Sequence, residues 1–479
     1  MSISPARRAA FKTLLRVFEQ EAYTDRAFAA EARRLNDRDR ALAQRLAYGT
    51  VQRVRTLDHA INELGKKSPG TFDPPVRAAL RLGAYQLAFS AGIPAHAAVN
   101  ESVELVREYG PPYAIKFTNA IMRRLSEGAR ALIENLPEWT PREAALRYSY
   151  PDWIAETFWR ELGPDDAPAL MRAQNEPAET AVRRNTLKQG ELEGDPDPLI
   201  PGALVVKRVD GKALADGLVW PQSRGSQLAG LAVGARAGER VLDVCAAPGG
   251  KTTQLAALGA EVTAIEKHEG RARELDENCR RLGAGAVRVL NADALDLPPE
   301  LSGFDRALVD APCSGLGVLA SRPDLRWRSH PLAELQLALL RAAAARVRPG
   351  GSVTYSVCTI NCEENEDVVS ALGLEPELVG DLAQVLVHFV FNGRDHVHTQ
   401  GEARRLFQQR RTLEIGLAAR GGLKAVKQLL DQSIGRAAGA RLDWLSRLGW
   451  RGAAQGHHQL LFHPAPPHGQ IAMRVLRLH

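Results

Sequence analysis

The chain has few cysteines, few aromatic residues and no long apolar run. Five cysteines in 479 residues, an odd number thinly spread, do not make a disulfide framework. No run of about 18 apolar residues occurs, and the charged start MSISPARRAAF leads into no apolar core. Neither a membrane span nor a signal peptide is therefore predicted, and we expect a cytoplasmic protein, a monomer, with no membrane partner.

The net charge of +6 is unevenly distributed along the chain. Residues 385–479 hold 14 Arg and Lys against 5 Asp and Glu, together with 8 of the 12 His, whereas residues 1–384 hold 48 against 51. This shift predicts a composition boundary near residue 385. The basic tail beyond it could be an appended arm, a large insertion before the last strand of a sheet, or sequence read out of its original frame.

The length predicts several domains. Residues 1–138 place apolar residues at three-to-four spacing throughout, which indicates an all-helical domain, and Asn100 resembles a helix cap. Residues 139–232 mix an aromatic helix, two possible strands (179–187 and 202–209) and a Pro/Gly/Asp-rich loop, which predicts a small connecting α/β unit. Residues 233–384 form the next domain, and 385–479 are an atypical tail of uncertain structure.

The domain at 233–384 alternates apolar strands with helices, a pattern typical of a parallel sheet. The expected strands are RVLDVCA, EVTAIE, VRVLNAD, FDRALVDAP and GSVTYSV. Ligands in such sheets bind beyond the carboxyl ends of the strands. The loop CAAPGGKT and four later strand ends, which carry Glu266, Asp293, Asp310 with Cys313, and Cys358, should therefore meet at one cleft.

The loop CAAPGGKT resembles half of a Walker motif, but its spacing is wrong. A P-loop needs glycine at the position that Cys245 occupies, which disfavours a nucleoside triphosphatase. A nucleoside cofactor without pyrophosphate fits better, because Gly249 and Gly250 allow a close backbone approach and Glu266 suits two ribose hydroxyls. Asp293 could accept a hydrogen bond from an adenine amino group. The alternative, in which the glycines form only a tight turn, is less favoured because all three strand ends agree.

The cysteines need separate interpretations. Cys245 and Cys279 carry side chains that we interpret as small buried apolar groups. Cys313, Cys358 and Cys362 could together suggest a zinc site. However, the sequence has no second pair of closely spaced cysteines, and no histidine lies in the cleft region. We therefore predict no metal.

Four motifs carry a family resemblance: LDVCAAPGGKT, VDAPCSGLGVL, RPGGSVTYSVCTI and EENEDVV. They resemble the RNA cytosine-carbon-5 methyltransferases, whose cofactor is S-adenosylmethionine. The segment LNDRDRALAQRLAYGTVQRVRTLDHAI resembles the NusB-like RNA-binding domain fused to the Fmu/Sun-type bacterial small-subunit ribosomal RNA methyltransferases. The resemblance implies a multidomain α and α/β protein, with a NusB-like domain before a Rossmann-like methyltransferase domain. Small-subunit ribosomal RNA or an assembly intermediate would be its partner.

The chemistry of such a reaction uses a thiolate. Addition of a thiolate to carbon 6 of cytosine makes carbon 5 nucleophilic enough to attack a sulfonium methyl. The resemblance implies that Cys358 is this nucleophile, that Cys313 assists product release, and that Asp310 faces both cofactor and base. It implies cofactor contacts from Cys245, Ala246, Ala247, Pro248, Gly249, Gly250, Lys251, Glu266, Asp293 and Asp310. Glu266 stands where the family more often has Asp.

Three alternatives stay open at this point. The chain could be a catalytically silent RNA-binding scaffold of antitermination type, although both cysteines and the whole cofactor loop favour an enzyme. It could be a DNA cytosine methyltransferase, but those enzymes typically use the Pro-Cys cysteine and do not need Cys358. Transfer RNA could also replace ribosomal RNA as the substrate.

Overall fold

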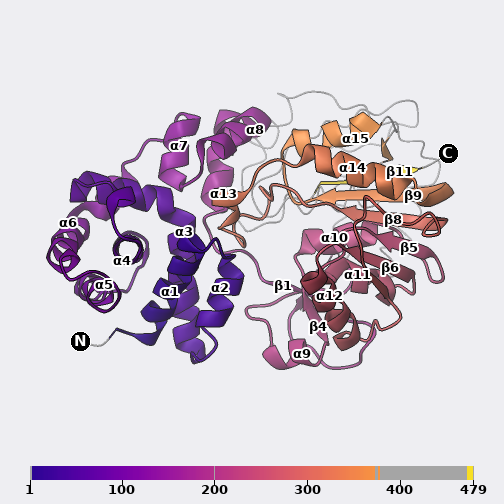
Figure 1. Ribbon diagram of the computed structural model, residues 1–479, viewed down its shortest axis with the longest axis horizontal. Helices are drawn as coiled ribbons and strands as arrows, with labels where there is room; N and C mark the ends of the chain where they lie inside the picture. The colour runs from indigo at the N-terminus through magenta and orange to yellow at the C-terminus, as the bar shows by residue number, and fades with distance from the viewer. Residues whose placement is uncertain (1–2, 199, 373–375, 378–471, 478–479) are drawn as a thin grey trace, which may run out of the picture.

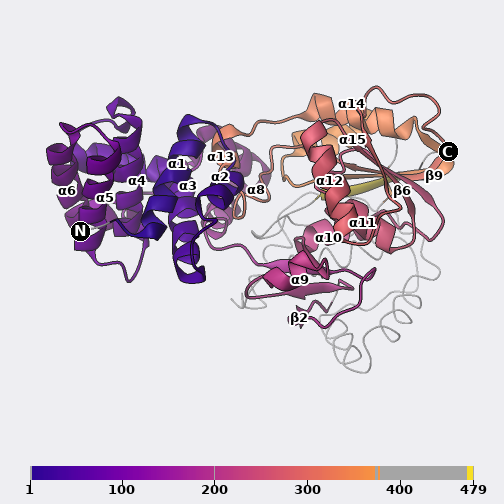
Figure 2. The same ribbon diagram turned by 60° about the horizontal axis from the view of Figure 1, so that its bottom comes forward.

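The computed structural model describes residues 3–198, 200–372, 376–377 and 472–477. A helical domain lies at one end of the long axis and an α/β domain at the other, with α7, α8 and α13 between them (Figure 1). The same arrangement is visible after rotation in Figure 2, where the small sheet with β2 and α9 lies apart from the main sheet.

The N-terminal domain is all-helical, as its apolar spacing predicts. Asn36 caps the longest helix, α3, because its Oδ1 accepts a hydrogen bond from the Asp39 N–H at 2.9 Å. The predicted cap at Asn100 is wrong: α5 begins five residues earlier, after Pro94, whose backbone is extended (φ −61°, ψ 136°). The helices are α1 Pro5–Glu19, α2 Thr24–Glu31, α3 Asp37–Gly65, α4 Pro74–Phe89, α5 Ala95–Tyr109 and α6 Ala114–Glu134, with a short 3-10 turn at Pro69–Thr71.

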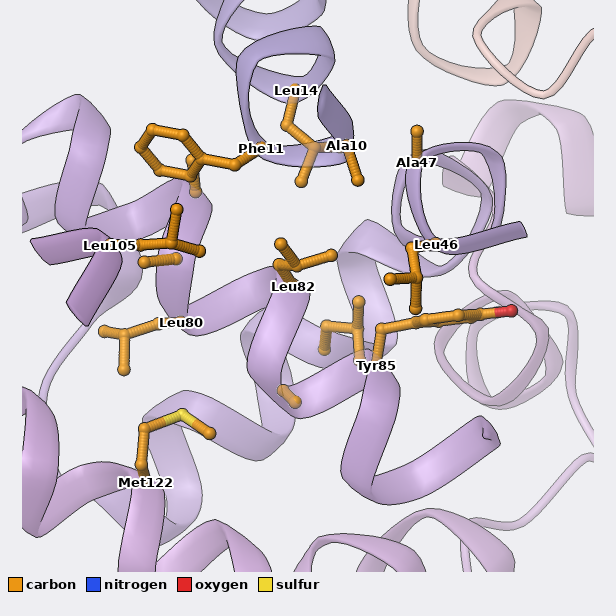
Figure 3. Packing of buried hydrophobic residues seen from close by; sticks show 14 of the residues in the cluster. Ala10, Phe11, Leu14, Leu46, Ala47, Leu80, Leu82, Tyr85, Leu105 and Met122 are labelled. Carbon is orange, nitrogen blue, oxygen red and sulfur yellow. The ribbon is translucent and has the colours of Figure 1, made fainter. Parts of the chain in front are cut away.

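The core of this domain surrounds α4 (Figure 3). Leu82 and Tyr85 of α4 lie among Leu14 of α1, Leu46 of α3 and other buried apolar side chains. Burying a leucine stabilises a fold by roughly 1.5–3 kcal/mol. The helical domain therefore has a hydrophobic core of its own.

Two helices connect the domains: α7 Pro141–Tyr148 and α8 Asp152–Ala173. A capping box starts α7, since Thr140 accepts from the backbone of Glu143 and the Glu143 carboxylate accepts from Thr140 N–H. Apolar side chains of both helices pack in one cluster with Leu316 and Leu319 of the α/β domain. The connecting helices thus pack directly against the loop that follows Cys313.

A small antiparallel sheet precedes the main one, with strand order β2-β3-β1-β4. The two strands expected within 179–187 and 202–209 are confirmed as β1 and β3, and the expected Pro/Gly/Asp-rich loop also contributes the two-residue edge strand β2. The elements are β1 Ala181–Arg184, β2 Asp195–Pro196, β3 Ala203–Val205, α9 Gly211–Ala215, β4 Val219–Pro221 and α10 Arg224–Ala232.

The main sheet has strand order β10-β11-β9-β8-β5-β6-β7. The five expected strands are confirmed and run parallel, and the order reverses at β5, where such sheets bind ligands. Side chains of α14 and α15 pack on one face of the sheet and those of α11 and α12 on the other. The elements are β5 Arg240–Asp243, α11 Gly250–Ala257, β6 Glu261–Glu266, α12 Glu269–Arg281, β7 Arg288–Asn291, β8 Phe304–Asp310, α13 Leu325–Arg328, α14 Ala333–Ala344, β9 Val347–Val357, a 3-10 turn (η2) at Cys362–Glu364 and α15 Glu366–Leu372.

The end of the basic tail joins this sheet. β11 Ala472–Arg477 pairs antiparallel with β9, and β10 Pro376–Glu377 pairs with β11. Of the three alternatives for the tail, this pairing favours an insertion before the last strand. Residues 385–471 lie outside the described residues.

Arg326 joins the α/β domain to the helical one. Its side chain is fully buried, and its guanidinium carbon lies 3.9 Å from the centre of the Tyr150 ring. Next to it, Trp327 Nε1 donates to Val51 O of α3 at 2.8 Å. The guanidinium donates to Gln52 O, Tyr148 O, Ser149 O, Gln174 O and Asn175 Oδ1 at 2.8–3.3 Å. The segment that begins at Cys313 is therefore anchored to α3 of the helical domain and to the connecting segment at 148–175.

Candidate active site

A cavity of about 240 Å³ opens at the carboxyl end of β5. Six predicted loop residues line it together with Asp310: Cys245, Ala246, Ala247, Pro248, Gly250 and Lys251. Gly249 adjoins it at the start of α11. The structure therefore brings the CAAPGGKT loop and the end of β8 to one site.

The glycines of this loop are required by geometry. Gly249 has φ +106°, a conformation that other residues rarely adopt. A Cβ on Gly250 would lie 2.7 Å from Nε1 of Trp220, which comes from the small antiparallel sheet and also lines the cavity. Sequence reasoning missed Trp220, because nothing local to β4 indicates that it reaches this site.

Sequence reasoning also missed Asp243, which ends β5 inside the LDVCAAPGG motif. The residue is 1% exposed, and its Oδ2 accepts from Thr252 Oγ1 at 2.8 Å. Its Oδ1 is buried without a hydrogen-bond partner in the described part of the chain, and burial raises the pKa of this carboxyl to about 7. A buried acceptor at the cavity wall suits a cationic amino group, so the site fits S-adenosylmethionine.

Glu266 and Asp293 end the neighbouring strands but are not in the described lining of this cavity. Glu266 is buried, and its carboxylate accepts from His268 N–H at 2.9 Å and lies 3.5 Å from the Arg271 guanidinium. Arg271 in turn donates to Ala247 O at 2.9 Å, which links Glu266 to the loop. Asp293 pairs with Lys267 at 2.7 Å, and this hydrogen bond lowers the pKa of its carboxyl.

Asp310 lies between the cofactor loop and β9. Its Oδ2 accepts from Lys251 Nζ at 2.7 Å, and its Oδ1 accepts from Ser356 Oγ at 3.0 Å. Ser356 stands opposite Asp310 in the β8–β9 register. Lys251 and Ser356 therefore hold the carboxylate at the cavity mouth in one orientation.

The two cysteines beyond β8 and β9 are in contact. Cys313 Sγ and Cys358 Sγ are 3.3 Å apart, although 45 residues separate them in sequence. Gly317 N–H donates to Cys358 O at 2.9 Å and links the two segments further. The hydrogen bond between the two sulfurs lowers the pKa of the Cys358 thiol, while the same bond and burial raise the pKa of the Cys313 thiol. The pair therefore favours a thiolate on Cys358 and a proton on Cys313.

Glu364 supports both cysteine segments. This fully buried carboxylate accepts from Ser314 N–H at 2.9 Å, from Leu332 N–H at 3.1 Å and from Gln336 Nε2 at 2.9 Å, and also from the Ser314 hydroxyl. Tyr355 of β9 donates to Glu364 O at 2.7 Å. Glu364 thus fixes the backbone next to Cys313.

The remaining cysteines differ in their surroundings. Cys279 is 1% exposed on α12, and burial raises the thiol pKa of Cys245 and of Cys279, the latter to about 12. Cys362 Sγ donates to Glu161 Oε2 at 2.8 Å. Over the residues that the structure describes, no group of three or more His, Cys, Asp or Glu side chains is placed to hold a metal ion.

Two segments of the chain match models of known protein families. Residues 231–389 match the family model described as 16S rRNA methyltransferase RsmB/F, and residues 4–127 match that of the NusB family. The ribosomal RNA small subunit methyltransferase B of Thermus thermophilus is 38% identical over 354 residues, which cover 71% of this chain and 80% of that protein. The chain belongs to the RsmB/F family.

Other similarities extend over most of the chain. The probable small subunit methyltransferase B of Synechocystis is 34% identical over 75% of this chain and 87% of its own length. The crystal structure of PH0851 superimposes with a TM-score of 0.66 at 26% identity, covering 79% of this chain and 91% of that one.

Family membership defines the enzyme class. The chain is an S-adenosylmethionine-dependent RNA cytosine-C5 methyltransferase with a NusB domain, in a family that methylates small-subunit ribosomal RNA. The fold and the cofactor expected from the motifs are confirmed. No helix of the described residues is long and apolar enough to cross a membrane.

Proposed function

We propose that Cys358 is the nucleophile of this methyltransferase, that Cys313 assists product release, and that Asp310 orients the target cytosine. The single observation that carries this assignment is the contact between the two sulfurs, 3.3 Å apart, with the thiolate favoured on Cys358. A thiolate is the reactive form of cysteine.

The residues of the cavity would hold the cofactor. We assign the backbone of 245–251, together with Asp243, Glu266, Asp293 and Asp310, to S-adenosylmethionine. When bound, the cofactor supplies an electrophilic methyl group on a sulfonium sulfur. Asp243 Oδ1 would accept a hydrogen bond from its amino group, and the backbone at Gly249 and Gly250 permits a close approach.

The proposed reaction proceeds by addition to the pyrimidine ring, methylation and elimination. The Cys358 thiolate adds to carbon 6 while Asp310 supports protonation of the ring nitrogen, and carbon 5 becomes nucleophilic. Carbon 5 would take the methyl group as the methyl–sulfur bond of the cofactor breaks, with the electron pair left on the sulfur, and carbon 5 would then lose its proton to a water molecule acting as base. The electrons of the carbon–hydrogen bond restore the ring double bond and expel Cys358 as thiolate. Cys313, next to Cys358, assists this elimination.

The test uses one protein variant for each sulfur. Wild-type protein, labelled S-adenosylmethionine and small-subunit ribosomal RNA should give labelled RNA. Cys358→Ala should abolish transfer, whereas Cys313→Ala should accumulate a protein–RNA adduct that survives denaturing electrophoresis. Cys279→Ala, remote on α12, is the matched control and should behave as wild type. An adduct that requires Cys313 and persists without Cys358 would reverse the two roles.

The substrate we propose is small-subunit ribosomal RNA, as in the named relatives, and the enzyme would act as a monomer in the cytoplasm. Bisulfite mapping of ribosomal and transfer RNA from cells with and without the protein identifies the modified cytosine. A site in transfer RNA alone would contradict this substrate. A silent scaffold would give no label with either RNA.

A further inference from the structure

A second cavity lies between α8 and the segments that carry the two cysteines. It is open to solvent and has a volume of about 400 Å³, within the range of small-ligand sites. Trp153, Glu156 and Arg160 line it from α8, where their spacing places them on one face of the helix. His330, from the loop after α13, and Glu363, from η2, line the facing wall. We call this cavity the α8 pocket.

The α8 pocket shares its supports with the catalytic cysteines. Glu363 precedes Glu364, whose carboxylate holds the N–H groups of Ser314 and Leu332. Glu363 also follows Cys358 by five residues, which places their Cα atoms at most about 18 Å apart. The α8 pocket therefore lies within reach of the nucleotides that flank a target cytosine bound at Cys358.

The lining suits a nucleobase better than a phosphate. Trp153 is half-buried, packs against the apolar cluster of α7 and α8 and also lines the pocket, and proteins use such aromatic rings to stack unpaired bases. Glu156 and Glu363 are exposed carboxylates that would repel phosphate but accept hydrogen bonds from a base. At the rim, Arg160 is 59% exposed, pairs with Glu161 at 3.0 Å and donates to Asn361 Oδ1 at 3.0 Å. The remaining N–H groups of its guanidinium are donors for a backbone phosphate.

We propose that the α8 pocket binds an unpaired base of the RNA near the target cytosine, and that it selects guanine. Guanine presents adjacent N–H donors that match the two oxygens of a carboxylate, whereas uracil lacks an amino group. Stacking on Trp153 and acceptance by Glu363 or Glu156 would hold the base. This inference rests on the proposed function, because it assumes an RNA strand that reaches Cys358.

The experiment uses RNA oligonucleotides that contain the mapped cytosine, with each flanking nucleotide replaced in turn by an abasic site. For wild-type enzyme, one position should raise KM about 5- to 100-fold, the range of a lost base stack. Trp153→Leu should raise KM on intact RNA to a similar extent and be insensitive to that abasic site. Trp139→Leu, at an 81% exposed tryptophan outside the pocket, is the matched control and should leave KM unchanged.

A second variant tests the base preference and does not depend on packing. Glu363→Gln keeps the shape of an exposed side chain but loses an acceptor, so it should reduce the preference for guanine over adenine at the sensitive position. If both variants match wild type at every position, the α8 pocket does not bind RNA. That outcome differs from failure of the proposed function, in which wild-type protein labels no RNA.

Discussion

Replacing Arg326 with alanine should separate the helical domain from the catalytic one. The substitution removes the donors to five acceptors, four of them carbonyl oxygens, and the stacking of the guanidinium on Tyr150. Hydrogen bonds to a charged group stabilise by about 1.5–3 kcal/mol each, and a desolvated cation–π contact by about 2 kcal/mol. If water replaces most of these partners, the loss is about 3–5 kcal/mol.

The assay is urea unfolding followed by tryptophan fluorescence, together with limited proteolysis near residues 134–141. Arg326→Ala should unfold at lower urea and become sensitive to protease at the junction between the domains. Methyl transfer should also fall, because the segment from Cys313 to Arg326 loses its anchor. Arg326→Lys should restore less than half of the stability, since lysine lacks the planar donor fork.

Arg328→Ala is the matched control. Its guanidinium lies 4.1 Å from the centre of the Tyr23 ring on the exposed side of α13, a contact worth about 0.5–1 kcal/mol. If the free energies of unfolding of Arg326→Ala and Arg328→Ala differ by less than about 1 kcal/mol, the buried guanidinium does not hold the domains together.

Three further predictions concern the catalytic domain. The pKa of Asp243 is about 7 in the folded protein and 3.8 for a free side chain. Between these pH values the cofactor-free folded protein keeps a proton on Asp243 that the unfolded chain has lost, so the free energy of unfolding falls as the pH rises towards 7. In urea unfolding, the free energy of unfolding of Asp243→Asn relative to wild type should therefore increase by up to about 4 kcal/mol from pH 4 to pH 8. The same difference between variant and wild type at both pH values would contradict this prediction. Gly249→Ala should weaken cofactor binding at least about tenfold by calorimetry, because φ is +106° and its Cβ would lie 2.8 Å from Leu275; unchanged affinity would show that the loop adjusts. Glu364→Ala should cost about 3 kcal/mol in thermal unfolding, since it leaves the buried N–H groups of Ser314 and Leu332 unpaired, and a loss below about 1 kcal/mol would count against that role.

The sheet and its site were predictable because they depend on local rules. Buried parallel strands are short apolar runs, and their carboxyl ends meet at one edge, so the end of β8 and the end of β9 were expected to converge. The motifs then indicated the family, the cofactor and the candidate thiols. By contrast, the cap expected at Asn100 was wrong, because the start of α5 depends on where the chain turns at Pro94 and not on the local residue pattern.

Contacts between distant segments were not predictable. Arg326 is a charged residue and would ordinarily lie at the surface, but the carbonyl groups of the connecting helices and of α3 bury it completely. Trp220 reaches the cofactor cavity from a separate small sheet. The unpaired oxygen of Asp243 likewise depends on the packing around β5, which no sequence pattern records.

The two cysteines illustrate the division most clearly. The sequence by itself determined that two thiols follow neighbouring strands, since apolar runs and strand-end motifs are local properties. Only the tertiary structure decided that the sulfurs lie 3.3 Å apart, a contact that lowers the pKa of Cys358 and raises that of Cys313. The physical reason is that a pKa depends on burial and on hydrogen bonds from distant residues, which exist only once the chain has folded.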